Sequence, residues 1–151
     1  MGKKESGNMG IESGNIGNTG SGKKFRSFLD LDVYKRTFEA SNTIIFRIIP
    51  KLPKNERFDL ADQMRRASKA IPTLIAEGYA KKYQQKGFQR YLQEAMSEAN
   101  EMIVHLSFAK EYLKTSLDEL DLLIESYVIA GKQLYKLQEN WRNLTKRIVF
   151  P

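Results

Sequence analysis

The feature that most constrains the fold of this chain is an unbroken run of apolar residues spaced alternately three and four apart. The run consists of Phe88, Leu92, Ala95, Ala99, Met102, Leu106, Ala109 and Leu113. This spacing places all of them on one stripe of an α-helix and is typical of left-handed helix packing. A helix over this range would be about 40 Å long. The sequence therefore predicts a long helix that buries one face against other helices.

Three further segments have helical spacing. The first covers Leu29 to Pro50, with Leu31, Tyr34, Phe38, Ile45 and Ile48 on its stripe and Ser41 filling the gap. The second begins near Asn55, an N-cap residue, and ends around Gly78, with Leu60, Met64, Ala67, Ile71 and Leu74 or Ile75 on its stripe. The last opens with a Ser116–Glu119 capping-box spacing and continues through Leu117, Leu120, Ile124, Tyr127, Gly131, Leu134 and Trp141. Four helices with short connections predict an all-α fold, an up-down-up-down antiparallel four-helix bundle over residues 25–151.

The last helix carries more apolar residues than one buried stripe requires. The additional residues are Leu123, Val128, Ile129, Tyr135, Leu137 and Leu144. A helix that is apolar over more than one stripe is either centrally buried or covered by a partner. Because each helix of a four-helix bundle keeps an outer face, this composition favours a homo-oligomer.

Residues 1–24 differ in composition from the rest of the chain. They hold seven of the ten glycines and no aromatic residue. Such a segment buries too little apolar surface to offset its ordering entropy, so we expect a disordered tail. The chain has no cysteine, no apolar run long enough to span a membrane and no signal-peptide pattern. A cytoplasmic location without membrane contact is the expectation.

A set of short motifs extends over roughly residues 25–140. The motifs are Phe28-x-x-Leu31-x-Val33-Tyr34, Pro53-x-x-Glu56, Gln63-Met64-Arg65-Arg66-Ala67, Ile75-Ala76-Glu77-Gly78, Phe88-x-x-Tyr91-Leu92-x-x-Ala95 and Glu101. Through these motifs the chain resembles the bacterial four-helix bundle proteins encoded by intervening sequences of 23S rRNA genes, a fold family that includes accessory variability determinant proteins of diversity-generating retroelements. Within this pattern, Arg65, Arg66, Pro72, Glu77 and Gly78 are interpreted as structural family residues. Ala70, Leu74, Glu98 and Ala99 depart from it, which puts any shared ligand contact at these positions in doubt.

The resemblance implies a fold and an assembly more firmly than an activity. It implies a homopentamer with basic surfaces around a central channel. Retroelement relatives bind a reverse transcriptase and nucleic acid, whereas the role of the rRNA-associated relatives is unsettled. RNA, DNA or a reverse transcriptase are therefore the partners that the resemblance implies.

Charge is distributed unevenly along the chain, whose net charge is +7. Residues 65–90 contain seven basic residues against one acid, a net of +6, whereas residues 94–125 contain eight acids against two lysines, a net of −6. Residues 132–147 return to +4, with five basic residues against one acid. An antiparallel bundle would bring the two basic stretches together at one end. The predicted nucleic-acid contacts are Lys81, Lys82, Lys86, Arg90, Arg142, Lys146 and Arg147. Tyr79 and Tyr83 lie among them and could stack on bases.

Other chemistry finds less support in the sequence. Adjacent Arg65 and Arg66 point about 100° apart on a helix, which favours a structural ion pair with an acid such as Glu77, Glu94 or Glu101 over a shared ligand. Glu94, Glu98, Glu101 and His105 line one helix face, but His105 is the only histidine and the Glu-x-x-His spacing of di-iron bundles is absent. We therefore expect no metal, no cofactor, no small-molecule substrate and no enzymatic activity. The alternative to nucleic-acid binding is a structural or protein-binding homo-oligomer.

Overall fold

The computed structural model describes residues 25–84, 86–115 and 117–149, with side chains as far as Asn143. These ranges contain helices and turns and no strand. The longer helices are α1 (Asp32–Thr43), α2 (Leu60–Ala80), α3 (Gly87–Tyr112) and α4 (Leu117–Val149). Short helical turns precede α1 (Phe28–Asp30) and follow it (Ile44–Ile48, Ile49–Lys51 and Lys54–Glu56). The tail predicted over residues 1–24 and Ser116 of the predicted capping box lie outside the described residues.

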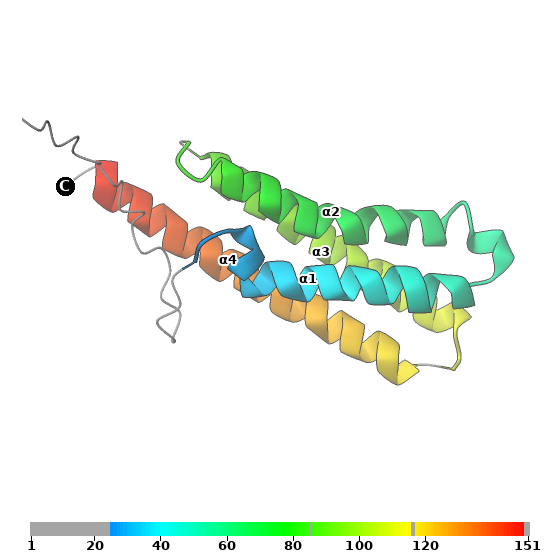
Figure 1. Ribbon diagram of the computed structural model, residues 1–151. Coiled ribbons are helices and arrows are strands. Elements are labelled where there is room, and N and C mark those ends of the chain that lie inside the picture. Colours follow the sequence, from blue (N-terminus) through cyan, green and yellow to red (C-terminus); the bar gives the residue numbers. More distant parts are fainter. Residues whose placement is uncertain (1–24, 85, 116, 150–151) are drawn as a thin grey trace, which may run out of the picture.

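The four helices lie side by side (Figure 1). α2 packs against α1 and α3, and α4 packs against α3 and α1, so each helix has two neighbours. The α2–α3 turn lies at one end of the molecule, and the α1–α2 and α3–α4 connections lie at the other (Figure 1). An ion pair from Lys110 to Asp121, 2.5 Å, joins the ends of α3 and α4 beside their connection.

The predicted stripes of α2 and α3 form the centre of the core. All eight members of the Phe88–Leu113 stripe are buried, as are Leu60, Met64, Ala67, Ile71 and Ile75 of α2. Most of them have no accessible surface. Burial of a leucine- or isoleucine-sized side chain contributes about 1.5–3 kcal/mol, so these two helices contribute substantially to stability. The spacing of apolar residues three and four positions apart therefore predicted the buried faces of α2 and α3 correctly.

The stripe predicted for the first helical segment is confirmed in part: Leu31, Ser41 and Ile48 are buried, Tyr34 and Ile45 are half-buried, and Phe38 is exposed. Phe38 is 50% exposed and stacks on Tyr34 with ring centroids 5.9 Å apart. The buried positions are Leu31, Val33, Thr37, Ala40, Ser41, Ile44 and Ile48. Thr37 can lie inside because its hydroxyl donates to the Val33 carbonyl at 2.8 Å, and Ser41 donates to Ser68 of α2 at 3.4 Å. The hydrogen-bonded hydroxyl groups of Thr37 and Ser41 thus occupy the buried face of α1, where the sequence pattern had predicted Phe38.

The start of α2 is a second correction. Asn55 does not cap the helix, because it lies in the short turn Lys54–Glu56 and α2 begins five residues later at Leu60. Backbone bonds of the tighter i to i+3 type use the amides of this segment, from Glu56 to Pro53, 2.9 Å, and from Arg57 to Lys54, 3.2 Å. Pro53 at the turn's N-cap favours this compact connection over an earlier helix start.

α4 confirms most of its predicted stripe. Leu120, Tyr127, Leu134 and Trp141 are buried, whereas Leu117 at the first position is 39% exposed. Leu123, one of the additional apolar residues, is also buried, while Val128 and Tyr135 are 40% and 59% exposed. The surplus apolar surface of α4 is therefore partly used within the chain and partly left at the surface.

Candidate nucleic-acid interface

The turn between α2 and α3 carries the first group of predicted contacts. Lys81 follows the last residue of α2, and the turn is closed by backbone bonds from Gln84 to Lys81, 3.0 Å, and from Gly87 to Gln84, 3.1 Å. Lys86 has a φ of 59°, in the left-handed region that non-glycine residues seldom adopt. A Cβ at Gly87 would lie 2.9 Å from the Lys81 carbonyl oxygen. Glycine is therefore required where the start of α3 passes close to the end of α2.

The far part of α4 is held against this turn. The indole Nε1 of Trp141 donates to the Lys82 carbonyl at 2.9 Å, and the Gln138 amide donates to the Gln89 carbonyl at 3.2 Å. Trp141 also packs edge-on against Phe88, with ring centroids 5.0 Å apart. These contacts bring Arg142 next to the turn that carries the lysines. Residues 146 and 147 continue α4 beyond it, and their side chains lie outside the described residues.

We call the resulting surface the basic pole and define it as Lys81, Lys82, Lys86, Arg90 and Arg142. Lys86, Arg90 and Arg142 are exposed, and Lys81 and Lys82 are half-buried. Two of these cations have carboxylate neighbours: Arg90 pairs with Glu94 at 3.1 Å, and Arg142 pairs with Glu139. Both pairs are exposed, and such pairs contribute little and exchange readily for other anions.

Tyrosine rings hold the two half-buried lysines. Lys81 donates to the Tyr91 hydroxyl at 2.7 Å, and its Nζ lies 4.9 Å from the centroid of that ring. Lys82 lies 4.1 Å from the Tyr79 ring and 4.9 Å from the Tyr83 ring. Contacts of this kind orient an ammonium group without neutralising it. The positive charge of both lysines therefore remains at this surface.

The two tyrosines predicted to stack on bases differ in exposure, although Lys82 lies near both rings. Tyr83 is 72% exposed. Tyr79 is half-buried, packs edge-on against Phe88 at 6.1 Å and carries Lys82 over its ring. Burial raises the pKa of the Tyr79 hydroxyl, and the neighbouring Tyr83 and Asp30 raise it further. Tyr79 therefore serves the packing of the pole, and Tyr83 is the residue available to a base.

The paired arginines have separate structural partners. Arg66 bridges two carboxylates of α3, Glu98 at 3.3 Å and Glu101 at 2.7 Å. Glu98 and then Glu101 raise the pKa of the Arg66 guanidinium. Arg65 instead approaches Asp62 at 3.8 Å, one turn earlier on the same helix. Among the ion pairs of the described residues, neither arginine pairs with Glu77 or Glu94, the other partners considered from the sequence.

Gly78 and Pro72 both lie in the buried face of α2. A Cβ at Gly78 would lie 2.6 Å from the Cβ of Tyr91, so this glycine allows α2 and α3 to approach closely where they enter the turn. Pro72 is buried within α2, which runs without interruption from Leu60 to Ala80. Both residues thus shape the helix that leads to the basic pole.

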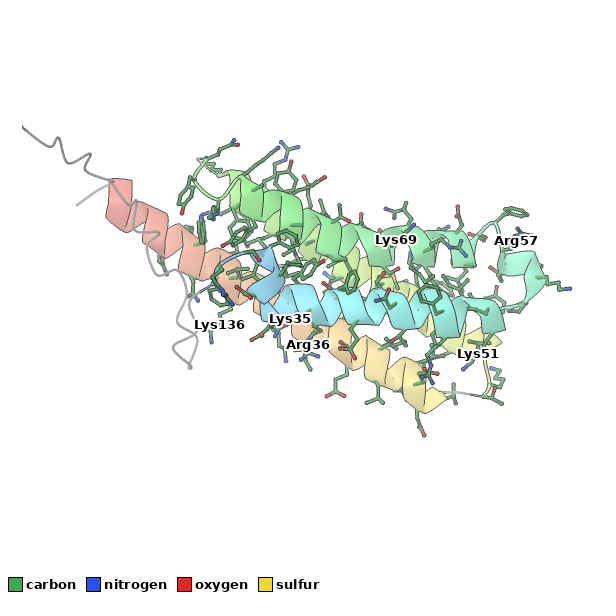
Figure 2. All side chains as sticks on the ribbon, in the orientation of Figure 1. Lys35, Arg36, Lys51, Arg57, Lys69 and Lys136 are labelled. Carbon is green, nitrogen blue, oxygen red and sulfur yellow. The ribbon has the colours of Figure 1, made fainter. Side chains whose placement is uncertain are left out.

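The sequence reasoning missed a second basic surface, formed by α1 and α4. Lys35, Arg36 and Lys136 lie on the same side of the molecule (Figure 2). Lys132 and Lys136 are one helical turn apart on α4, and both are exposed. The signal was present in the sequence, as Lys35-Arg36 near the start of one helix and two lysines four apart on another. This signal did not lead to a prediction, because the predicted contacts were confined to the end where residues 65–90 and 132–147 meet.

The end of the molecule opposite the basic pole is less acidic than the net charge of residues 94–125 predicted. Glu119 accepts from Arg47 at 2.7 Å and from Lys51 at 3.3 Å, both from the segment after α1. The connection between α1 and α2 therefore brings cations to the end where residues 94–125 alone predicted a net negative charge.

The carboxylate row on α3 is used in ion pairs and hydrogen bonds. Glu101 bonds to the buried His105 ring at 3.0 Å and to Arg66. Among the described residues, no group of three or more histidines and acids is placed to hold a metal ion. No described helix has the length and apolar content required to cross a membrane.

Comparison with known proteins is informative at the level of the family. Residues 29–136 match the sequence model of a family described as 23S rRNA-intervening sequence protein. The match includes Lys81, Lys82, Lys86 and Arg90 of the basic pole, and it ends before Arg142. No curated protein matches the chain in sequence.

Proposed function

The chain belongs to the 23S rRNA-intervening sequence protein family, and from that premise we propose that it is a non-enzymatic protein that binds nucleic acid through its basic pole. The observation that carries the proposal is the contact of Trp141 with the Lys82 carbonyl, which brings a second basic stretch to the lysine-bearing turn. The family description, which names ribosomal RNA, agrees with a polyanionic partner.

The proposed mechanism is neutralisation of phosphates by clustered cations. Each phosphate contact releases condensed counterions, so the affinity should fall steeply as salt concentration rises. The start of α3 adds to this field, because its N-cap residue Lys86 offers no side-chain acceptor to the first-turn amides and a helix N-terminus favours anions. Recognition of this kind tolerates any sequence, since phosphates are common to all nucleic acids.

We infer that the four helices form an up-down-up-down antiparallel bundle and that several copies assemble into a ring, with five subunits implied by the resemblance. The alternation of the connections between two ends of the molecule supports the bundle (Figure 1). The exposed Val128 and Tyr135 on α4 support a partner surface. A ring would repeat the basic pole around its axis and strengthen the field that attracts a polyanion.

Charge reversal tests the proposed function. We expect Lys81→Glu, Lys82→Glu and Lys86→Glu together to reduce the affinity for 20-nucleotide single-stranded RNA and DNA by about 100-fold or more, because three phosphate contacts become repulsions. Fluorescence anisotropy measures the affinity, and light scattering measures whether assembly is unchanged. The matched control reverses three cations outside the pole: Lys54, Arg57 and Lys69.

Retained affinity in the pole variant would contradict the proposal. Unmeasurable binding by the unaltered protein, with a stable oligomer, would favour the structural alternative instead.

A further inference from the structure

The groove between α1 and α4 contains polar groups that lack partners. Its volume is about 700 Å³, within the range of about 300–1,000 Å³ typical of ligand sites. Its polar lining comprises Asp32, Arg36, Glu39 and Thr43 from α1, Arg47 from the turn after α1, and Glu119, Ser126 and Gln133 from α4. Nε of Arg36 and Oε1 of Gln133 are buried and have no hydrogen-bond partner among the described residues. The remaining contact of the Arg36 guanidinium is a long bond to the Ser126 hydroxyl, 3.4 Å.

Buried donors and acceptors without partners are costly. Here the two side chains that carry such atoms, Arg36 and Gln133, both line the same groove. A ligand that accepts from Arg36 and donates to Gln133 would satisfy both. The edge of a nucleobase has this combination, since guanine, adenine and cytosine each present acceptors beside an amino or imino donor. Arginine and glutamine are among the side chains that read such edges.

The charges of the groove indicate which part of a nucleotide would enter it. Asp32, Glu39 and Glu119 line the groove together with Arg36 and Arg47, and Arg47 pairs with Glu119 at 2.7 Å. A phosphate inside the groove would therefore meet the carboxylates of Asp32 and Glu39 beside Arg36. A neutral base would not be repelled, and carboxylates can accept from its amino groups. The acidic lining therefore excludes the backbone and admits the base.

The rim of the groove has the opposite character. Lys35 adjoins Arg36, and Lys132 and Lys136 flank Gln133 on α4, and all three lysines are exposed. Figure 2 shows Lys35 and Lys136 on the side of the molecule where Arg36 lies. The lysines of α4 continue toward Arg142 of the basic pole along the same helix. The phosphates of a bound single strand could thus follow α4 from the basic pole to the rim of the groove, and one base of that strand could enter the groove.

We infer that the α1–α4 groove binds an unpaired nucleobase of a single-stranded nucleic acid, with Arg36 and Gln133 contacting the base edge and Lys35, Lys132 and Lys136 contacting the flanking phosphates. The inference rests on the proposed nucleic-acid binding and adds a base-contacting site to it. A duplex does not fit this site, because its bases are stacked and paired.

The test compares oligonucleotides with and without bases. Fluorescence anisotropy is measured for 12-nucleotide single strands of RNA and DNA, for the same lengths with abasic residues throughout, and for a duplex. The unaltered protein should bind the base-containing single strands about tenfold more tightly than the abasic ones, since one good set of base-edge contacts gives discrimination of this order. RNA and DNA arms show whether the 2′-hydroxyl contributes.

Two substitutions remove the base contacts while preserving fold and charge. Arg36→Lys retains the positive charge but lacks Nε and the planar guanidinium, and Gln133→Leu removes the acceptor without adding a charge. We expect the double variant to lose the preference for base-containing strands and to keep its affinity for abasic strands and its salt dependence. Lys136→Glu is the matched control: it should weaken binding to all strands about equally and reduce the salt slope by about one unit.

An unchanged preference in the double variant would overturn the inference and leave the basic pole as the site of binding. A change of oligomeric state in that variant, with the preference retained, would assign the groove to a protein contact and also overturn it. If the pole variant loses binding to every strand while the double variant loses only the preference, both proposals stand. Absence of binding by the unaltered protein would overturn both.

Discussion

At the scale of single residues, the chain uses its charges in linked groups. Glu101 connects α2 and α3, because it accepts from Arg66 at 2.7 Å and bonds to His105 of the next turn at 3.0 Å. Partial burial raises the pKa of Glu101, but the bonds from His105 and Arg66 outweigh this effect and leave the pKa below its ordinary value of 4.5. The carboxylate is therefore more stable in the folded chain than in the unfolded one.

Replacement of this carboxylate should change stability in a pH-dependent way. A lowered pKa contributes stability above the unfolded-state value and loses it as the pH falls through the folded-state value. We expect Glu101→Gln to lower the free energy of unfolding by about 1 kcal/mol or less at pH 7, since the group is partly exposed and screened. The difference from the unaltered protein should shrink as the pH falls below 4.5.

Urea denaturation at neutral and acidic pH measures both effects, and Glu94→Gln, which removes an exposed pair with Arg90, is the matched control. A Glu101→Gln difference that does not vary with pH would contradict this interpretation of the network.

At the scale of helices, close approach at Gly78 fixes how α2 and α3 meet before the basic pole. A Cβ at this position would lie 2.6 Å from Cβ of Tyr91 and 3.0 Å from a Phe88 ring carbon. Gly131 of α4 offers a comparison, because a Cβ there would meet no atom within 4 Å. The two glycines occupy helix interiors but serve different purposes.

Alanine at the two positions should therefore have opposite effects. We expect Gly78→Ala to destabilise the protein by about 1–3 kcal/mol through overpacking. Gly131→Ala should be neutral or stabilise by up to about 1 kcal/mol, because alanine favours the helix. Thermal and urea unfolding measure both changes. Equal effects of the two substitutions would show that the approach of α2 to α3 is looser than the distances indicate.

The helices also show how far sequence reasoning extends. The three-four pattern located α3 and the stripe of α2, because many consecutive apolar positions agree there. It failed at Phe38, because the burial of Thr37 and Ser41 depends on partners that the pattern does not contain. It also failed at Asn55, where turn bonds compete with an earlier helix start.

The candidate site was predictable to a similar degree. The meeting of residues 81–90 with the end of α4 followed from the expected topology and agrees with the contacts of Trp141. The tyrosine contacts of Lys81 and Lys82 did not follow, since they depend on side-chain directions within a turn. The α1–α4 groove was not predicted either, because a partnerless buried atom is visible only in three dimensions.

At the scale of the whole molecule, the charge is arranged in three dimensions rather than along the sequence. The basic pole combines cations from the α2–α3 turn, the start of α3 and α4. Lys136 of α4 lies on the same side of the molecule as Lys35 and Arg36 of α1 (Figure 2). The opposite end is partly neutralised by Arg47 and Lys51 at Glu119. A polyanion would therefore be drawn to one end and along one side of the molecule.

The salt dependence of single-stranded RNA binding tests the central claim most directly. If the five cations of the basic pole each displace one counterion, the logarithm of the association constant should fall with the logarithm of salt concentration with a slope of about −3.5 per subunit. The triple reversal of Lys81, Lys82 and Lys86 should flatten this slope by about two units or abolish binding. A slope near zero for the unaltered protein, or one that the reversal leaves unchanged, would contradict the claim that the basic pole binds nucleic acid.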